Sequence, residues 1–157
     1  MTGLIITGGS INCAFAGAFL KIREFDMVIA VDGGLAAVKS LNIRPDAIVG
    51  DFDTVKGELL EEYRRMGGIA FEQHQPEKDE TDTELALRTA MEAGVNDIVL
   101  LGATGGRLDH SIGNIHLLYA CLQKGVKASI VDEKNRLYIL DQGKTYRFGE
   151  IWGKYIS

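Results

Sequence analysis

Short apolar runs alternate with amphipathic stretches along most of the chain. The apolar runs have the length and composition of buried strands, and most are followed by a glycine- or aspartate-containing turn. The stretches between them repeat their apolar positions at helical spacing. Strands are expected at 4–7, 27–31, 47–49, 69–72, 97–101 and 127–131, and helices at 12–23, 35–41, 55–66, 82–93 and 109–124.

This alternation predicts an α/β fold, namely a three-layer α/β/α domain with a mainly parallel sheet. In such sheets, ligands bind beyond the carboxyl ends of the strands. The turns that follow the strands are therefore where functional residues are expected.

The pattern changes after residue 132. Residues 137–140 and 145–148 read as hairpin strands around Gly143, and Trp152 begins a further apolar stretch that runs to Ser157. Because a lone hairpin is not stable in water, we expect an α/β domain at 1–132 and, at 133–157, the incomplete N-terminal part of a small β-sandwich domain. An intact-mass measurement compared with the full reading frame would test this hypothesis.

Charge and composition restrict the classes of partner. The 157 residues carry a net charge of −5 and give a pI of about 5.2, which does not favour binding to nucleic acid or to an anionic membrane. The stretch at the start has no charged segment followed by an apolar one, and no apolar run is long enough to span a membrane. Cys13 and Cys121 are expected to be reduced, buried thiols of a cytoplasmic protein.

The segment Gly50-Asp51-Phe52-Asp53-Thr54 follows the third expected strand. If the strand continued through it, Asp51 and Asp53 would point to the same side, because side chains alternate between the two faces. Two like charges at that spacing are typical of a site for Mg²⁺ with a phosphate. The alternative is an acidic turn in which Thr54 caps the next helix.

A second acidic segment, Lys78-Asp79-Glu80-Thr81-Asp82-Thr83-Glu84, lies where a loop enters a helix. Thr81 and Glu84 have the spacing of a capping box, which explains part of it. Four carboxylates within six residues exceed what a cap needs, so Asp79 and Asp82 are candidates for a metal or phosphate site. Lys78 is placed to reach a phosphate.

A third segment, Gly105-Gly106-Arg107-Leu108-Asp109-His110, follows a strand and opens a helix. Its glycines would let backbone N–H groups approach a phosphate, and Arg107 could bind a phosphate with two hydrogen bonds. Asp109 is either part of this site or the N-cap of the helix. A histidine such as His110 in a first helical turn is more often structural than catalytic.

Other signals are weaker or missing. Gly8-Gly9-Ser10 and Asp32-Gly33-Gly34 are strand-to-helix turns, where glycine is common with or without a ligand. The chain lacks a P-loop, a G-x-G-x-x-G fingerprint and a G-x-S-x-G nucleophile elbow, and its scattered histidines do not indicate zinc. The acidic and arginine-bearing turns converge on one rim of the predicted sheet, which favours metal-assisted phosphoryl or pyrophosphoryl transfer.

The three segments, in this order, resemble the motifs of the thiamine pyrophosphokinase family, and the resemblance covers residues 3–157. It implies Mg²⁺-dependent transfer of diphosphate from ATP to the hydroxyl of thiamine, giving thiamine diphosphate and AMP. It also implies an ATP-binding α/β domain, a thiamine-binding β-sandwich and a homodimer. Thr54 stands where the family usually has serine, and the chain stops where the thiamine-contacting β motif begins.

The resemblance assigns roles residue by residue. The metal ligands would be Asp51, Asp53 and Asp79; Asp82 would lie near the metal, and Arg107 would stabilise the transferred group. Either Asp82 or Asp109 would accept the hydroxyl proton, and this choice stays open. The expected contacts to substrates are Gly8, Gly9, Asp32, Gly33, Gly34, Lys78, Thr81, His110, Asn114 and Ser157.

Three other functions remain open at this point. The chain could be a diphosphokinase for another alcohol, such as a hydroxymethylpterin, or a nucleotide-binding regulatory protein without catalysis. A phosphatase is the third possibility, and it would release phosphate rather than AMP.

Overall fold

The computed structural model describes residues 1–73, 80–147, 149, 152–153 and 155–156. Strands and helices alternate in these ranges as the apolar pattern predicts, with bounds that differ from the expected ones by a few residues. The strands are β1 (Thr2–Ile6), β2 (Met27–Val31), β3 (Ala47–Gly50), β4 (Ala70–Gln73), β5 (Asp97–Leu101), β6 (Lys127–Val131) and β7 (Arg136–Leu137). The helices are α1 (Cys13–Ile22), α2 (Gly34–Ser40), α3 (Gly57–Met66), α4 (Asp82–Glu92) and α5 (Leu108–Gln123).

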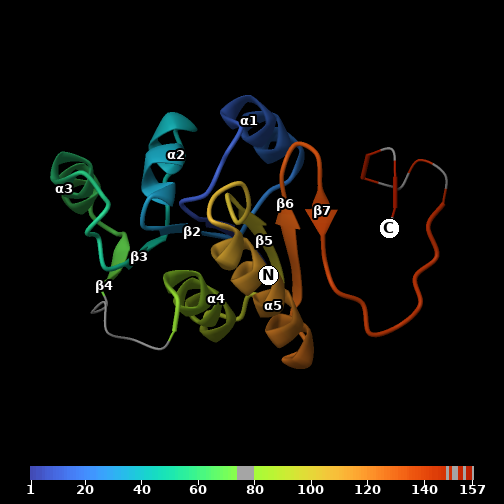
Figure 1. The fold of residues 1–157 in the computed structure, drawn as a ribbon. Helices are drawn as coiled ribbons and strands as arrows, with labels where there is room; N and C mark the ends of the chain where they lie inside the picture. Colours follow the sequence, from blue (N-terminus) through green and yellow to red (C-terminus); the bar gives the residue numbers. More distant parts are fainter. Residues whose placement is uncertain (74–79, 148, 150–151, 154, 157) are drawn as a thin grey trace.

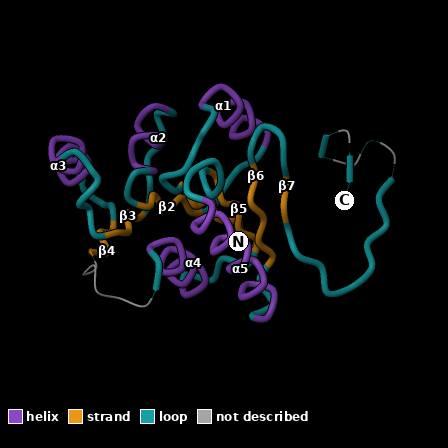
Figure 2. The backbone as a smooth tube through the Cα atoms, in the orientation of Figure 1, coloured by secondary structure: helices purple, strands orange, loops and turns teal. Residues whose placement is uncertain are grey.

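The described strands form one sheet in the order β4-β3-β2-β1-β5-β6-β7. Neighbours from β4 to β6 are parallel, and β7 pairs antiparallel with β6. Helices α1, α2 and α3 cover one face and α4 and α5 the other, as Figure 1 and Figure 2 show. The predicted three-layer α/β/α fold with a mainly parallel sheet is thus confirmed.

Alternation along the central strand builds a core on each face. In β1, Leu4 and Ile6 pack in the cluster under α1, α2 and α3, whereas Ile5 packs in the cluster under α4 and α5. All three side chains are at most 1% exposed. A strand buried on both faces reads as a continuous apolar run, which is why the sequence shows no polar alternation there.

The order in which successive strands are added to the sheet reverses between β1 and β5. Strands β2, β3 and β4 lie on one side of β1, and β5 and β6 lie on the other. The helices that follow β1 and β5 therefore leave toward opposite faces, and their first turns separate at the carboxyl ends of the two strands. This switch point is where ligands bind in open α/β sheets.

The hairpin expected after residue 132 does not form in the described residues. The segment contributes only β7, which extends the main sheet as an antiparallel edge strand, and residues 138–147 contain no strand. The hydroxyls of Tyr138 and Tyr146 are in contact, and the Lys144 ammonium lies 4.8 and 5.1 Å from their two ring centroids. Side chains rather than a backbone ladder hold these residues together, because an isolated hairpin buries too little surface to be stable.

One local expectation is also wrong, and one alternative interpretation is excluded. Cys13 is exposed at the first position of α1, where Asn12 accepts hydrogen bonds from the N–H groups of Ala14 and Phe15, each at 3.1 Å; only Cys121 is a buried thiol. Thr54 does not cap a helix, because α3 begins at Gly57. No helix in the described part of the chain is both long enough and apolar enough to cross a bilayer.

Candidate functional site

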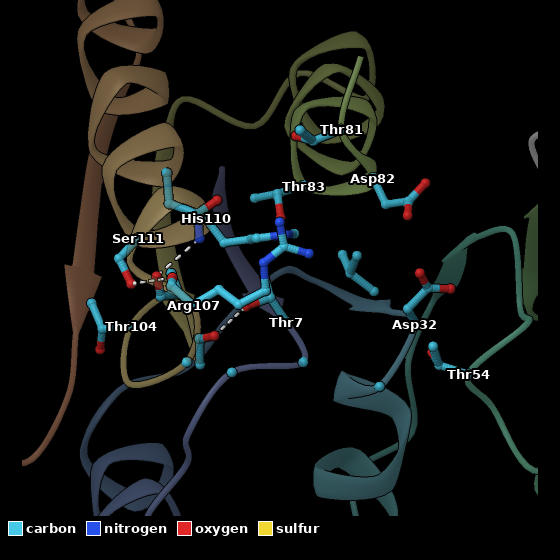
Figure 3. Close-up of a pocket in the computed structure, with 18 of the residues that line it drawn as sticks. Thr7, Asp32, Thr54, Thr81, Asp82, Thr83, Thr104, Arg107, His110 and Ser111 are labelled. Atoms are coloured by element: carbon cyan, nitrogen blue, oxygen red, sulfur yellow. Dashed lines mark hydrogen bonds between the residues drawn. The ribbon is translucent and has the colours of Figure 1, made fainter. Parts of the chain in front are cut away.

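A cavity of about 530 Å³ lies at the switch point between β1 and β5. Its walls come from the turns that follow β1, β2, β3 and β5 and from the first turns of α4 and α5. Figure 3 shows Asp32 and Asp82 on one side of it and Arg107 and His110 on the other. The cavity therefore has an acidic side and a side that carries a guanidinium.

Asp32 anchors the acidic side. It follows β2 with φ of 40°, in the left-handed region that aspartate and asparagine tolerate better than most residues. Its carboxylate accepts the Phe52 N–H at 3.2 Å. Burial, followed by a hydrogen bond shared with Asp82, raises the pKa of Asp32 to about 7. Two carboxylates therefore compete for the same space, and one of them holds a proton more readily than an exposed aspartate does.

The turn after β3 fits closely around that carboxylate. Gly50 has φ of 152°, and a Cβ at this position would lie 1.9 Å from the Asp32 Oδ1. Phe52 then takes φ of 65°, which turns its ring into the core, where it is 8% exposed and packs edge-on against Phe71. Gly50 is therefore required by the space that Asp32 fills, and Phe52 fixes the direction of the turn.

Asp51 and Asp53 flank Phe52 in a turn and not in a strand, because β3 ends at Gly50. The expectation that strand alternation aligns them is therefore wrong, but they still lie together: the Asp53 N–H donates to the Asp51 Oδ1 at 3.0 Å. A side-chain hydrogen bond shared with Asp51 raises the pKa of Asp53. Asp51 lines the cavity, and Asp53 lies beside it.

The acidic side suits a hard divalent cation. Asp32, Asp51, Asp53 and Asp82 influence one another's charge, and repulsion among them favours protonation unless a cation is near. Carboxylate oxygens are the ligands that Mg²⁺ prefers. Among the residues that the structure describes, no three acidic, histidine or cysteine side chains already converge as a complete metal site. Asp79, the third predicted ligand, lies outside the described residues.

Arg107 is held by an aspartate two residues further along the chain. Its Nε and Nη2 donate to the two carboxylate oxygens of Asp109 at 3.2 and 2.6 Å. Asp109 lies in the first turn of α5, and Arg107 occupies the N-cap position that had been considered for Asp109. The hydrogen bond from Arg107 lowers the pKa of Asp109. Both side chains are largely exposed, at 75% and 63%, so this pair can exchange its partners.

The turn after β1 is bonded to the turn that carries Arg107. The N–H groups of Gly9 and Ser10 donate to the carbonyls of Gly102 and Thr104 at 2.8 and 2.9 Å, and Ser10 Oγ donates to Gly105 O at 2.6 Å. A Cβ on Gly9 would lie 2.2 Å from Gly102 O. Glycine at position 9 therefore permits the contact between the two turns, and its N–H is already used.

Two further predicted residues have structural explanations. A Cβ on Gly34 would lie 2.1 Å from Ile6 O, so this glycine lets α2 approach β1 closely. Asn114 Nδ2 donates to Ala103 O at 2.9 Å and so ties α5 to the turn after β5. The Asn114 side-chain oxygen is left to accept another hydrogen bond.

The structure brings most of the predicted site residues together. Asp109 lines an adjoining chamber, Asp53 and Gly34 lie outside both linings, and Lys78, Asp79 and Ser157 fall outside the described residues. The predicted residues that line the main cavity are Gly8, Gly9, Asp32, Gly33, Asp51, Thr81, Asp82, Arg107, His110 and Asn114.

Sequence reasoning missed several hydroxyl side chains in the lining. Thr7 directly follows β1, and Thr104 lies close to the end of β5. Their positions after strands could have identified both residues from the sequence. No feature of the sequence indicated a functional role for Thr83, because the capping box already explains its segment. Thr81 Oγ1 accepts the Glu84 N–H at 3.2 Å, as that box requires. Only its place in the lining of the folded cavity identifies Thr83.

The raised pKa of Asp32 predicts a pH-dependent gain in stability for Asp32→Asn. Between the ordinary value of 3.8 and about 7, the folded protein holds a proton that the unfolded chain has lost, so the contribution to stability declines as pH rises through about 7. Asparagine tolerates the left-handed backbone and can still accept the Phe52 N–H. At pH 8, without metal or nucleotide, urea titration should show that the variant is more stable than wild type by about 2 kcal/mol, allowing for solvent screening of a half-buried group.

Asp26 serves as a comparison, because its pKa is shifted in the opposite direction from that of Asp32. A hydrogen bond from the Thr2 N–H, at 2.7 Å, lowers the pKa of Asp26, so its contribution is present at neutral pH and lost in acid. Asp26→Asn should therefore destabilise the protein at pH 8. Equal effects of the two substitutions would contradict the assignment of Asp32.

Comparisons with known proteins agree with this geometry. A profile described as "Thiamin pyrophosphokinase, catalytic domain" matches residues 20–130. The thiamine pyrophosphokinase of Bacillus subtilis (strain 168) is 36% identical over 123 residues, which cover 77% of this chain and 56% of that protein. The chain therefore spans little more than half of this relative's length.

Solved structures give the same result. The crystal structure of thiamine pyrophosphokinase from Bacillus subtilis superposes with a TM-score of 0.73 at 30% identity, covering 87% of this chain and 62% of that one. The protein from Geobacillus thermodenitrificans gives a TM-score of 0.71 at 30% identity, with 88% and 62% covered.

Proposed function

This chain belongs to the thiamine pyrophosphokinase family, and on that basis we propose that it transfers a diphosphate group from ATP to the hydroxyl of thiamine, yielding thiamine diphosphate and AMP. The observation that carries the proposal is the cavity that Asp51 helps to line and in which Asp32 and Asp82 lie opposite Arg107 (Figure 3). A polyphosphate with its metal ion is the ligand whose charges match both sides.

Asp51 and Asp53, together with Asp79, would hold Mg²⁺. The metal ion would neutralise charge on the ATP phosphates, as in other phosphoryl transfers. The protein's own contribution at this position is a rigid turn: Gly50 and Phe52 hold Asp51 toward the cavity. Preorganised ligands lower the cost of fixing the phosphates in a reactive orientation.

Asp82 is the better candidate of the two for accepting the proton of the thiamine hydroxyl. Asp109 is bound by Arg107, and its lowered pKa makes it a poor base. Asp82 lines the cavity and shares a hydrogen bond with Asp32, so its carboxylate is in position to accept a proton from a hydroxyl bound there. The hydroxyl oxygen then attacks the β-phosphorus, and AMP leaves from the opposite side.

Arg107 would bind the transferred diphosphate. Two of its donors, on Nε and Nη2, bind Asp109, and a phosphate offers oxygens in the same bidentate geometry. The exchange replaces one charge-assisted pair by another and places the guanidinium against the group whose charge shifts during the reaction.

The wider organisation follows the resemblance. Residues 1–132 would form the ATP-binding catalytic domain and 133–157 the beginning of a thiamine-binding β domain, with the protein acting as a cytoplasmic homodimer that binds neither nucleic acid nor membrane. Trp152 packs edge-on against Phe15 and Phe19, so the last residues contact the α1 side of the α/β domain.

Product analysis tests the function directly. Incubation with ATP, Mg²⁺ and thiamine should yield AMP and thiamine diphosphate in equal amounts, measured by ³¹P NMR and chromatography. Omission of thiamine is the control and should suppress AMP formation. Because this chain spans little more than half of its relative, the same assay on the full reading frame distinguishes a missing acceptor site from a wrong reaction.

The other outcomes correspond to the competing functions. AMP formed with a hydroxymethylpterin but not with thiamine would indicate a different acceptor. Release of inorganic phosphate would indicate a phosphatase, and Mg²⁺-dependent ATP binding without AMP from the full reading frame would indicate a regulatory protein.

A further inference from the structure

Asp132 lies between the turn that carries Arg107 and the segment that follows β6. It comes directly after β6, and β6 lies beside β5 in the sheet. Its Oδ2 accepts the Thr104 hydroxyl at 3.1 Å, although the two residues are 28 positions apart in the chain. Its Oδ1 accepts the N–H groups of Lys134 and Asn135 at 2.8 and 2.7 Å. One carboxylate therefore joins the turn after β5 to the turn between β6 and β7.

The Asp132 carboxylate is charged at neutral pH. Asp132 is partly buried, and burial alone would raise its pKa. Hydrogen bonds from Lys134, Asn135 and Thr104 outweigh that effect and lower the pKa of Asp132. A charged acceptor binds the Thr104 hydroxyl more strongly than a neutral one does. The bridge is therefore a strong link between two turns, although Asp132 itself does not line the cavity.

Thr104 belongs to the turn that leads to Arg107. It lines the cavity, and Figure 3 shows it on the same side as Arg107. The Arg107 side chain is 75% exposed and bonds to Asp109, which is also exposed. Because its partner is an exposed neighbour in the chain, the position of the guanidinium depends on the backbone of the preceding turn. That turn is held from α5, from the turn after β1 and, through Asp132, from the end of β6.

We propose that Asp132 is a positioning residue for the reaction: it fixes Thr104 and, through it, the turn from which Arg107 reaches the transferred diphosphate. The inference rests on the proposed function, which gives Arg107 its role. The same carboxylate closes the turn before β7, so the segment after β6 also takes part in placing Arg107. A shift of β7 would move the acceptor of the Thr104 hydroxyl and would thereby reach the site.

Asp132→Ala should lower kcat for AMP formation by about 10-fold and change the Kd for ATP by less than about 3-fold, because a displaced guanidinium loses contact mainly with the group in transfer. The decisive comparison repeats this substitution in Arg107→Ala. There it should lower kcat by less than about 2-fold, since the residue that Asp132 positions is already gone. Steady-state kinetics and equilibrium binding on the full reading frame supply both values.

Two further variants separate the bridge from the turn between β6 and β7. Thr104→Val removes the hydroxyl but keeps the bonds of Asp132 to Lys134 and Asn135, so it should lower kcat even if Asp132→Ala unfolds. This loss should likewise disappear in Arg107→Ala. Asp132→Asn should recover most of the activity, because its oxygen can accept the same two N–H groups while its amide donates to Thr104 Oγ1.

Asp26→Ala is the matched control. Asp26 also accepts a threonine hydroxyl at 3.1 Å, from Thr2, and it accepts the Thr2 N–H at 2.7 Å. This bridge joins the amino ends of β1 and β2, at the rim of the sheet opposite the cavity. Its removal should lower the stability of the protein and leave kcat unchanged.

Equal losses of kcat from Asp132→Ala in wild type and in Arg107→Ala would overturn the inference, as would wild-type kcat in both Asp132→Ala and Thr104→Val. A wild-type protein that forms no AMP would instead reject the proposed function. Backbone NMR signals of residues 105–107 then test the bridge by itself. They should shift in Asp132→Ala and not in Asp26→Ala, and unchanged signals would show that Asp132 does not position this turn.

Discussion

Asp51→Asn should lower the rate of AMP formation by at least about 10³-fold, because it removes a charged metal ligand from the centre of the site. The fold should survive. The Asp51 Oδ1 accepts the Asp53 N–H at 3.0 Å, and the asparagine side-chain oxygen can accept the same hydrogen bond. Turnover is measured on the full reading frame with saturating ATP and thiamine, and circular dichroism checks the fold.

Glu58→Gln provides a control with the same change from carboxylate to amide. Glu58 is exposed in α3 and lies outside the cavity, so this variant should retain wild-type turnover. A wild-type rate for Asp51→Asn would remove Asp51 from the metal site, and a comparable loss in both variants would indicate a general effect of charge.

Arg107→Ala should lower kcat by about 10²- to 10³-fold and raise the Kd for ATP by less than about 10-fold. The reason is that the guanidinium stabilises charge on the group in transfer more than it holds the bound nucleotide. Steady-state kinetics together with equilibrium binding separates the two effects. An equal loss in both quantities would leave Arg107 as a simple binding residue.

Arg23→Ala is the control for Arg107→Ala, because it removes an arginine that is also paired with an aspartate but lies away from the cavity. Arg23 bonds to Asp97 at 3.0 Å, at the amino end of β5 and away from the cavity, and its loss should not change kcat. Arg107→Lys should recover only part of the activity, since an ammonium keeps the charge but cannot bind two oxygens in a fixed plane.

The strands and helices of the main sheet could be predicted because burial on both faces leaves unbroken apolar runs. The convergence of the acidic turns and the Arg107 turn was also predictable, since all of them follow parallel strands. The backbone conformation of these turns could not be predicted. Asp51 and Asp53 lie together because Phe52 adopts a left-handed conformation, and no residue type announces that for a phenylalanine.

The structure after residue 132 and the burial of single side chains could not be predicted from the apolar pattern, because they depend on contacts between distant segments. Apolar and aromatic residues after 132 favour strands, but strand pairing requires a neighbour, and in the described residues only β7 finds one in β6. Cys13 was expected to be a buried thiol because the two cysteines lack the spacing of metal ligands, but spacing does not fix burial, and Cys13 lies exposed at the first position of α1. Thr83 acquires significance only from the α5 side of the cavity.

The bonds between the turns after β1 and β5 also determine when the site can exist during folding. Ser10 and Gly105 are separated by 95 positions in the chain, and β1 and β5 are adjacent in the sheet. Contacts of such large sequence separation form slowly because the intervening loop must close first. A nascent chain that has emerged only through β4 already contains the Asp32 and Asp51 turns, but it lacks the strand that places Arg107 opposite them. The two halves of the cavity therefore become a binding site only when β5 inserts beside β1, so nucleotide added during refolding should be captured in the same step in which β5 joins the sheet.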